Sequence, residues 1–117
     1  MRHWGPYAHV YVAEFDDGCI KVGATHNPKN RRTQLNGRLP IGVVKRTRFE
    51  VVGKSMLWGD AVAAEQSLIA QLAGISERRV KIEWFYGPEF LTVLELAARA
   101  VEDAIAASPY GYKWGHR

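Results

Sequence analysis

Three side chains that can act on an anionic group lie in the first third of the sequence: Tyr11, Lys21 and Arg31. A phenol can exchange a proton with a reacting group, and an ammonium supplies a compact positive charge. A guanidinium presents paired donors that fit the oxygens of a phosphate. Whether these groups can act together depends on the elements that carry them.

A β-hairpin is predicted where two runs rich in Val, Ile, Tyr and Phe, Tyr11–Phe15 and Cys19–Ala24, flank a turn at residues 16–18. With a three-residue turn, Tyr11 faces Gly23, and Lys21 shares that face because residues two apart in a strand point the same way. Gly23 is expected to leave a gap beside the phenol for a ligand or a backbone segment. The alternative is that Tyr11 packs in the core and Lys21 is a solvated strand residue.

A short basic helix is predicted directly after the hairpin, over residues 27–36. Asn27 suits its N-cap, Pro28 its first position and Gly37 the residue past its end. Arg31 then falls on the second turn, where its side chain can lean toward the same face of the hairpin. The phenol, the ammonium and the guanidinium are therefore expected to converge.

A carboxylate, Glu65, falls on the apolar side of a longer helix predicted over residues 56–72 and ended by Gly74. The apolar stripe of this helix consists of Leu57, Ala61, Ala64, Leu68, Ile69 and Leu72. An unpaired buried charge is costly, so Glu65 needs a partner. A divalent metal ion or Arg31 would serve, and a structural Glu–Arg ion pair is the alternative to a metal site.

A third strand is predicted over residues 43–52, after a loop at 37–42. Further on, residues 76–80 are expected to form a polar connection and residues 81–86 a short extended segment. Within that segment Glu83 is expected to face solvent, and the alternative is a carboxylate that supports the metal site from outside. Together with the hairpin, these elements predict a small three-stranded antiparallel sheet.

A final helix is predicted over residues 88–107, because Pro88 suits its start and its apolar residues recur at helical spacing. The expected buried stripe of this helix is Leu91, Leu94, Ala98, Val101 and Ile105. The fold class is therefore α+β, with helices packed against the three-stranded sheet. We expect a single domain over residues 1–117, with its core at about 8–107 and an aromatic, basic tail at 108–117.

Positive charge is concentrated in one stretch of a chain whose net charge is +4. Residues 21–54 contain nine Lys or Arg against one acid, Glu50. Such a basic stripe is typical of a protein that binds a phosphate backbone, although a solvated face gives the same count. The side chains expected to contact nucleic acid are Lys29, Arg32, Arg38, Lys45, Arg46 and Arg48.

The sequence also bears on the compartment. No apolar run is long enough to span a bilayer, and the N-terminus lacks a signal-peptide pattern, so no membrane association is expected. A single cysteine, Cys19, excludes an internal disulfide and fits a packing residue in a strand. A cytoplasmic location follows as the expectation.

Tyr11, Lys21, Arg31 and the residues around them resemble the core of the GIY-YIG endonucleases. The resemblance is carried by Val10-Tyr11-Val12, Lys21-Val22-Gly23, Thr25, Asn27, Arg31 and Leu35. Further on, the segment Ala63–Gln66 and the triplet Glu83-Trp84-Phe85 resemble the short phage-type branch of that superfamily. The likeness covers most of the chain, and the sequence departs from the pattern at Lys21, where the family has its second tyrosine.

The resemblance implies a metal-dependent endonuclease that hydrolyses phosphodiester bonds in nucleic acid, with DNA as the expected substrate. Tyr11 would activate a water, Arg31 would stabilise charge on the phosphate, and Glu65 would hold one Mg²⁺ or Mn²⁺. Lys21 would clamp the phosphate or act as the base. Specificity is expected to come from a homodimer, from the C-terminal tail or from an accessory protein.

Two other functional classes stay open. A catalytically silent nucleic-acid-binding module would keep the basic residues, and Glu65→Ala would then change little. A small partner-binding protein, such as a phage-encoded inhibitor, would bind polynucleotide weakly and with little salt dependence. The exposed aromatic residues considered for that role are Trp4, Tyr110, Tyr112 and Trp114.

Overall fold

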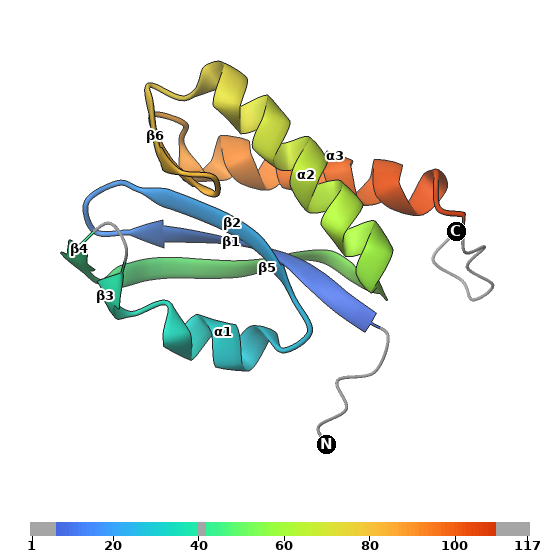
Figure 1. Ribbon diagram of the computed structural model, residues 1–117, viewed down its shortest axis with the longest axis horizontal. Coiled ribbons are helices and arrows are strands. Elements are labelled where there is room, and N and C mark those ends of the chain that lie inside the picture. Colours follow the sequence, from blue (N-terminus) through green and yellow to red (C-terminus); the bar gives the residue numbers. More distant parts are fainter. Residues whose placement is uncertain (1–6, 40–41, 110–117) are drawn as a thin grey trace.

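Five strands form one antiparallel sheet in the order β5-β1-β2-β7-β6, and two more form a separate hairpin, β3-β4 (Figure 1). The structure is a computed structural model that describes residues 7–39 and 42–109. The elements in chain order are β1 (Tyr7–Phe15), β2 (Ile20–Thr25), α1 (Pro28–Gln34), β3 (Gly37–Leu39), β4 (Gly42–Val44), β5 (Arg46–Leu57), α2 (Trp58–Ile75), β6 (Arg78–Lys81), β7 (Trp84–Tyr86) and α3 (Phe90–Ala106).

The predicted α+β class is confirmed, but the prediction of a three-stranded sheet is wrong. β5, β1 and β2 are the three expected strands, and β7 and β6 extend the sheet beyond β2. These two strands come from the residues expected to form a short extended segment and a polar connection. All four side chains of β6 are exposed, so no alternation of apolar and polar residues marks it as a strand.

The β1–β2 hairpin has the predicted register. Tyr11 lies opposite Gly23, so that Tyr11, Lys21 and Gly23 share one face. At the turn, the Asp17 carboxylate accepts a hydrogen bond of 3.0 Å from the backbone N–H two residues on. Gly18 takes a φ of +88°, a conformation that glycine adopts without a steric penalty. The turn residues therefore set the register that brings the phenol and the ammonium to the same side.

The sheet is covered on both faces. α2 and α3 lie on one face, called here the helix face, and α1 lies on the other, the α1 face (Figure 1). The main core, on the helix face, includes Val10, Val12, Val22, Leu68, Leu72, Phe85 and Val93. The cluster on the α1 face consists of Tyr11, Ala13, Phe15, Cys19, Leu35 and Trp84. Because β1 is buried on both faces, its sequence is an almost continuous apolar run.

The helix boundaries agree with the prediction only in part. The Asn27 side chain caps α1 by accepting from the Asn30 N–H at 3.0 Å, as predicted, but the helix ends at Gln34, and Gly37 begins β3. The expected first residues of α2 continue β5 instead, and α2 runs past Gly74. Glycine tolerates a helix interior at a small cost, so Gly74 does not end the helix.

The stripe that α3 buries differs from the predicted one. Its buried residues are Phe90, Val93, Ala97, Ala100 and Val101, whereas Leu91 is 66% exposed. Val101 belongs to both stripes, as predicted, whereas Leu91, Leu94 and Ala98 each lie one residue after a buried position, and the two stripes have similar apolar content. Packing against the sheet determines which of the two stripes is buried, and the periodicity of the helix alone does not show this.

The third predicted strand is divided in two. Residues 42–44 pair with 37–39 in place of the expected loop, and β5 begins only after Lys45.

None of the described helices is long and apolar enough to cross a membrane. Of the aromatic residues considered for partner binding, Trp4 and those at 110–117 lie outside the described residues.

Candidate active site

The outer edge of β2 is only partly paired. β7 pairs with β2 at Ile20 and Lys21, and the Val22 N–H donates to the Glu83 carbonyl at 3.2 Å. Beyond that point, as far as Thr25, no described strand continues the pairing. Side chains from both faces of the sheet can therefore reach the same stretch of edge.

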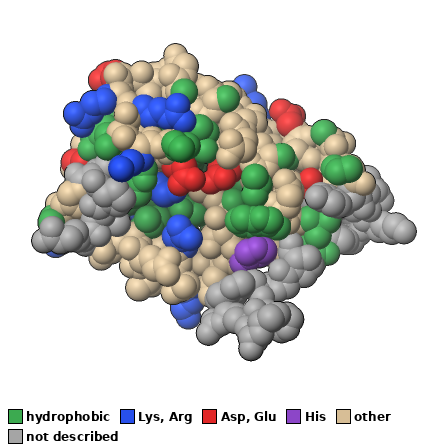
Figure 2. All heavy atoms as spheres, viewed as in Figure 1, with side chains coloured by type: hydrophobic (Ala, Val, Ile, Leu, Met, Phe, Trp, Pro, Cys, Tyr) green, Lys and Arg blue, Asp and Glu red, His purple; other side chains and the backbone are tan. Residues whose placement is uncertain are grey.

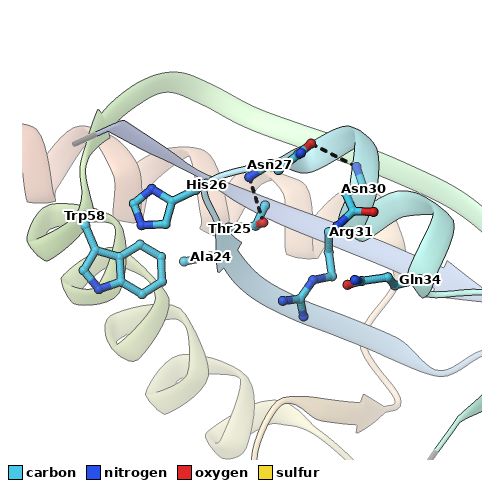
Figure 3. A pocket seen from close by; sticks show the side chains of 8 residues that line it. All are labelled: Ala24, Thr25, His26, Asn27, Asn30, Arg31, Gln34 and Trp58. Carbon is cyan, nitrogen blue, oxygen red and sulfur yellow. Dashed lines mark hydrogen bonds between the residues drawn. The ribbon is translucent and has the colours of Figure 1, made fainter. Parts of the chain in front are cut away.

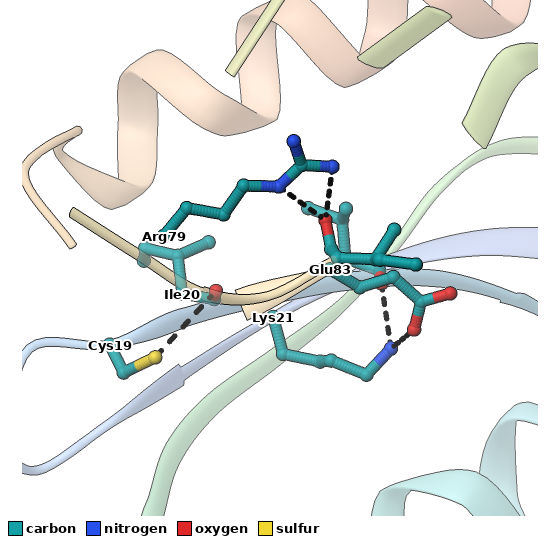
Figure 4. Close-up of polar contacts among 7 residues, drawn as sticks. Cys19, Ile20, Lys21, Arg79 and Glu83 are labelled. Carbon is teal, nitrogen blue, oxygen red and sulfur yellow. Dashed lines mark hydrogen bonds and ion pairs between the residues drawn. The ribbon is translucent and has the colours of Figure 1, made fainter. Parts of the chain in front are cut away.

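Lys21 is buried beside this edge, so the alternative that it is a solvated residue is wrong. Its side chain is 6% exposed, and its ammonium lies 5.6 Å from the ring centre of Tyr11 and 5.5 Å from that of Trp84. The ammonium donates to the Val22 carbonyl at 2.8 Å and forms an ion pair with Glu83 (Figure 4). An ammonium has three N–H donors, so one is left for a ligand.

Two carboxylates meet at the same edge. Glu65 comes from α2, and Glu83 comes from the connection between β6 and β7. Burial, the negative charge of Glu83 and a hydrogen bond with Glu83 together raise the pKa of the Glu65 carboxyl to about 6, although Lys21 and the Ala24 backbone N–H oppose the shift. No ion pair joins Glu65 to Arg31 within the described residues. The charged neighbours of Glu65 are therefore a second acid, Glu83, and the Lys21 ammonium.

Tyr11 is packed on the α1 face. Its side chain is fully buried, and its ring stacks on that of Phe49 with the centres 5.1 Å apart. The gap expected beside Gly23 is filled by the phenol itself, because a Cβ on Gly23 would lie 2.5 Å from the phenol oxygen. That oxygen has no hydrogen-bond partner among the described residues. A buried hydroxyl without a partner is unusual in a folded protein and often marks a functional position.

Arg31 borders a pocket of about 200 Å³ between the end of β2, α1 and the start of α2 (Figure 3). The residues that line it are Ala24, Thr25, His26, Asn27, Asn30, Arg31, Gln34 and Trp58. Among the described residues, no hydrogen bond or ion pair engages the guanidinium of Arg31. Ala24 links the pocket to the carboxylates, since it lines the pocket and its backbone N–H lies close enough to Glu65 to favour the charged carboxylate. Arg31 is thus brought to the same end of β2 as Glu65.

Three of the residues predicted to bind nucleic acid gather around α1: Lys29, Arg32 and Arg46. Lys29 and Arg32 are exposed on the helix, and Arg46 Nε donates to the Arg32 carbonyl at 2.9 Å. Burial and the nearby charge of Arg32 lower the pKa of Arg46. These three residues form a basic patch beside Arg31.

The other predicted contacts do not extend this patch. Arg48 turns to the helix face, where its guanidinium lies 5.0 Å from the ring centre of Phe90 and forms an ion pair of 3.5 Å with Glu14. Lys45 is exposed just before β5. The side chain of Arg38 lies outside the described part of the structure. The basic stretch of the sequence is therefore divided between different sides of the molecule.

A second basic region lies on β6, which the sequence analysis treated as a connection. Arg78, Arg79 and Lys81 are all exposed. The Arg78 guanidinium lies 4.3 Å from the ring centre of Tyr86, and Arg79 donates to the Ile82 carbonyl. On the face seen in Figure 2, basic side chains gather over β6, acidic side chains lie near the centre, and further basic side chains lie beyond them. Acidic groups thus lie between two basic regions.

The carboxylate pair fits one hard divalent cation that shares its ligands with a substrate. Mg²⁺ is usually held by one or two carboxylates together with waters and phosphate oxygens, and Mn²⁺ also prefers oxygen ligands. In the part of the chain that is described, no group of three or more His, Cys, Asp or Glu could hold an ion. Glu65 and Glu83 would therefore supply two ligands, and a cation between them would relieve the repulsion that raises the pKa of Glu65.

Sequence reasoning missed Glu83, His26 and Trp58. Glu83 was expected in solvent, yet it directly precedes the buried Trp84, and this adjacency to a strand that anchors the sheet could have indicated its position. His26 and Trp58 stack with their ring centres 4.6 Å apart. They belong to segments far apart in the sequence, so no local pattern indicates that they meet.

Comparison of the chain with models of protein families, with curated proteins and with solved structures finds no match. The resemblance to the GIY-YIG endonucleases therefore stays a prediction.

Proposed function

We propose that this chain is a metal-dependent endonuclease of the GIY-YIG type that hydrolyses phosphodiester bonds in nucleic acid, with DNA as the expected substrate. The observation that carries the proposal is the meeting of Glu65 and Glu83 with the Lys21 ammonium at the unpaired edge of β2. One ammonium balances one carboxylate. A second, partly buried carboxylate beside them is unfavourable unless another cation is bound, and the proposed metal ion supplies that charge.

Each side chain is assigned a role that suits its chemistry. Glu65 and Glu83 hold the divalent ion, and Lys21 donates its remaining N–H to a phosphate oxygen. Arg31 stabilises the negative charge that develops on the phosphate, and losing one such donor typically costs about 3 kcal/mol of barrier, roughly a hundredfold in rate. When bound, the metal ion supplies Lewis acidity and a more acidic water.

Tyr11 is assigned the role of base, in which its deprotonated oxygen takes the proton of the attacking water. Its hydroxyl lies over Gly23 and has no partner among the described residues, and the Lys21 ammonium lies 5.6 Å from the centre of its ring. A phenol already paired with a protein acceptor would have to break that bond before it could act. The assignment requires that a water reaches this hydroxyl when the substrate binds.

The buried position of that same hydroxyl favours a second candidate, a nucleic-acid-binding module without catalysis. Such a module would use the patch of Lys29, Arg32 and Arg46 and the basic residues of β6. The carboxylates would then be structural. The two candidates differ in the role of Glu65: the endonuclease needs it to cleave DNA, whereas the silent module binds DNA without it.

The test is cleavage of supercoiled plasmid, single-stranded DNA and structured RNA with Mg²⁺, with Mn²⁺ and with EDTA. We expect metal-dependent nicking by the wild type, and its loss in Arg31→Ala and Glu65→Gln. Binding of the same substrates, measured at low and moderate salt, is the parallel readout, because backbone contacts weaken steeply with salt. Salt-sensitive binding without cleavage in all three proteins would favour the silent module, and activity that survives in both variants would place the chemistry elsewhere.

A further inference from the structure

We infer that the pocket beside Arg31 binds one unstacked nucleobase, that of the nucleotide next to the cleaved phosphate; this inference rests on the proposed endonuclease function. The pocket measures about 200 Å³. Pockets for drug-sized ligands measure about 300–1,000 Å³, so this one suits a single ring system and not a run of stacked bases. Its lining combines an aromatic side, an amide side and an arginine (Figure 3).

The aromatic side is built from Trp58 and His26. Trp58 is the first residue of α2, and 44% of its surface is exposed. Its ring stacks on His26, with the centres 4.6 Å apart and the planes inclined by 21°. An aromatic side chain left partly in water beside a small polar pocket is the feature that proteins use to stack an unpaired base.

The amide side comes from α1. Asn30 and Gln34 are four residues apart, so they lie on the same side of the helix, and both line the pocket. No hydrogen bond within the described residues occupies either side-chain amide, and each amide offers donors and an acceptor. The polar edges of nucleobases combine the same two kinds of group.

The histidine adds an oriented acceptor. His26 Nδ1 lies 2.9 Å from the Tyr7 carbonyl oxygen, and a carbonyl can only accept, so Nδ1 carries the hydrogen. In the neutral ring Nε2 is then an acceptor. The imidazole is therefore held in one orientation by the backbone and keeps one nitrogen for a ligand.

The rim of the pocket is set before any ligand arrives. Thr25 Oγ1 accepts from the Asn27 N–H at 3.1 Å, and Asn27 Oδ1 accepts from the Asn30 N–H at 3.0 Å. These bonds fix the connection between β2 and α1, which lowers the cost of ordering it on binding. Arg31 lines the same pocket, so a phosphate at its guanidinium and a base against Trp58 would belong to one nucleotide or to neighbouring ones.

The test is NMR titration of the whole isotope-labelled chain with 2′-deoxynucleoside 5′-monophosphates and with 2-deoxyribose 5-phosphate, which has no base. We expect the nucleotides to bind about tenfold tighter than the sugar phosphate, with signal changes at the pocket residues. Trp58→Ala should lose that preference. Leu91→Ala, which truncates an even more exposed apolar residue at the start of α3, should keep it. Equal affinity for the sugar phosphate, or an unchanged preference in Trp58→Ala, would overturn the inference.

The NMR spectrum reports whether Trp58→Ala is folded; if it is not, the double variant Asn30→Ala with Gln34→Ala serves instead. A second arm moves one abasic nucleotide along a cleaved DNA strand, and we expect the rate to fall at one position next to the cut. Metal-dependent cleavage that is insensitive to every abasic position would overturn the base pocket and leave the endonuclease standing. A base preference in the titration without any cleavage would overturn the endonuclease function and leave the base pocket standing.

Discussion

Replacing Gly23 by alanine tests the packing that holds Tyr11. The added Cβ would lie 2.5 Å from the phenol oxygen, 2.6 Å from Cζ and 2.8 Å from Cε2. Carbon atoms in proteins do not approach other heavy atoms so closely without a covalent bond. The ring cannot move aside freely, because Tyr11 is fully buried and stacked on Phe49. Gly23→Ala must therefore displace the ring or separate β2 from its neighbour.

The expected loss in the free energy of unfolding is about 2 kcal/mol, in the middle of the roughly 1–3 kcal/mol range for overpacked cores. The closest contact involves the hydroxyl, so Gly23→Ala should cost about 1 kcal/mol less in a Tyr11→Phe background. The two residues are thus predicted to be coupled. A displaced phenol should also lower any metal-dependent cleavage.

The assay is urea denaturation, followed by circular dichroism, of the wild type, the two single variants and the double variant. Gly74→Ala is the matched control: Gly74 lies within α2, nothing lies within 4 Å of an added Cβ, and alanine should stabilise the helix by up to about 1 kcal/mol. A Gly23→Ala protein as stable as the wild type would refute the placement of the phenol over Gly23. Purely additive changes would refute the coupling.

Three further predictions concern the same site. Tyr11→Phe removes a buried hydroxyl that has no described partner, so it should raise the free energy of unfolding by about 1 kcal/mol while abolishing cleavage, measured by denaturation and plasmid nicking. The pKa of Glu65 is raised from 4.5 to about 6, so the folded state binds this proton more tightly than the unfolded chain; the resulting stability is complete below pH 4.5 and lost as the pH rises through about 6. Because Glu65 is only half buried, the free energy of unfolding of Glu65→Gln should be about 1 kcal/mol higher than that of the wild type near pH 8 in EDTA, and equal to it near pH 4.5. The exposed control Glu95→Gln should show no such difference between the two pH values. Excess Mg²⁺ should raise the melting temperature of the wild type but not that of Glu65→Gln.

The hairpin and its register could be predicted because they depend on neighbouring residues. The turn at residues 16–18 fixes which residues face one another, and the period of two along a strand then places Tyr11, Lys21 and Gly23 on one face. Asn27 likewise caps its helix through a bond to a residue three positions on. Both features depend on residues only a few positions apart, and both are confirmed.

The remainder of the site depends on contacts between distant segments. β6 has only exposed side chains and becomes a strand because β7 pairs with it. The pairing of β7 with β2 brings Glu83 to Lys21, and a residue expected in solvent thereby becomes the partner of a buried ammonium. Similarly, the gap expected beside Gly23 is absent because the phenol of Tyr11 fills it. This could be predicted only by knowing where the ring of Tyr11 points.

The basic stripe shows the same limit. Charge counted along the sequence placed Arg46 and Arg48 in one surface, but β1 and β5 change register between Glu14 and Phe15. Arg46 consequently reaches α1, and Arg48 reaches Phe90 on the helix face. A change of one residue in register moves a side chain to the other face, and composition carries no record of it.

We propose that Glu65 and Glu83, the acids at the edge of β2, would hold a metal ion that is needed for cleavage of nucleic acid. The most direct measurement is the nicking rate of supercoiled plasmid as Mg²⁺ is titrated, for the wild type, Glu65→Gln, Glu83→Gln and the exposed control Glu95→Gln. We predict saturable, EDTA-sensitive nicking by the wild type and the control, and its loss in both site variants although they remain folded. Nicking that is unchanged in Glu65→Gln, or that is absent from the wild type at every metal concentration, would contradict the claim.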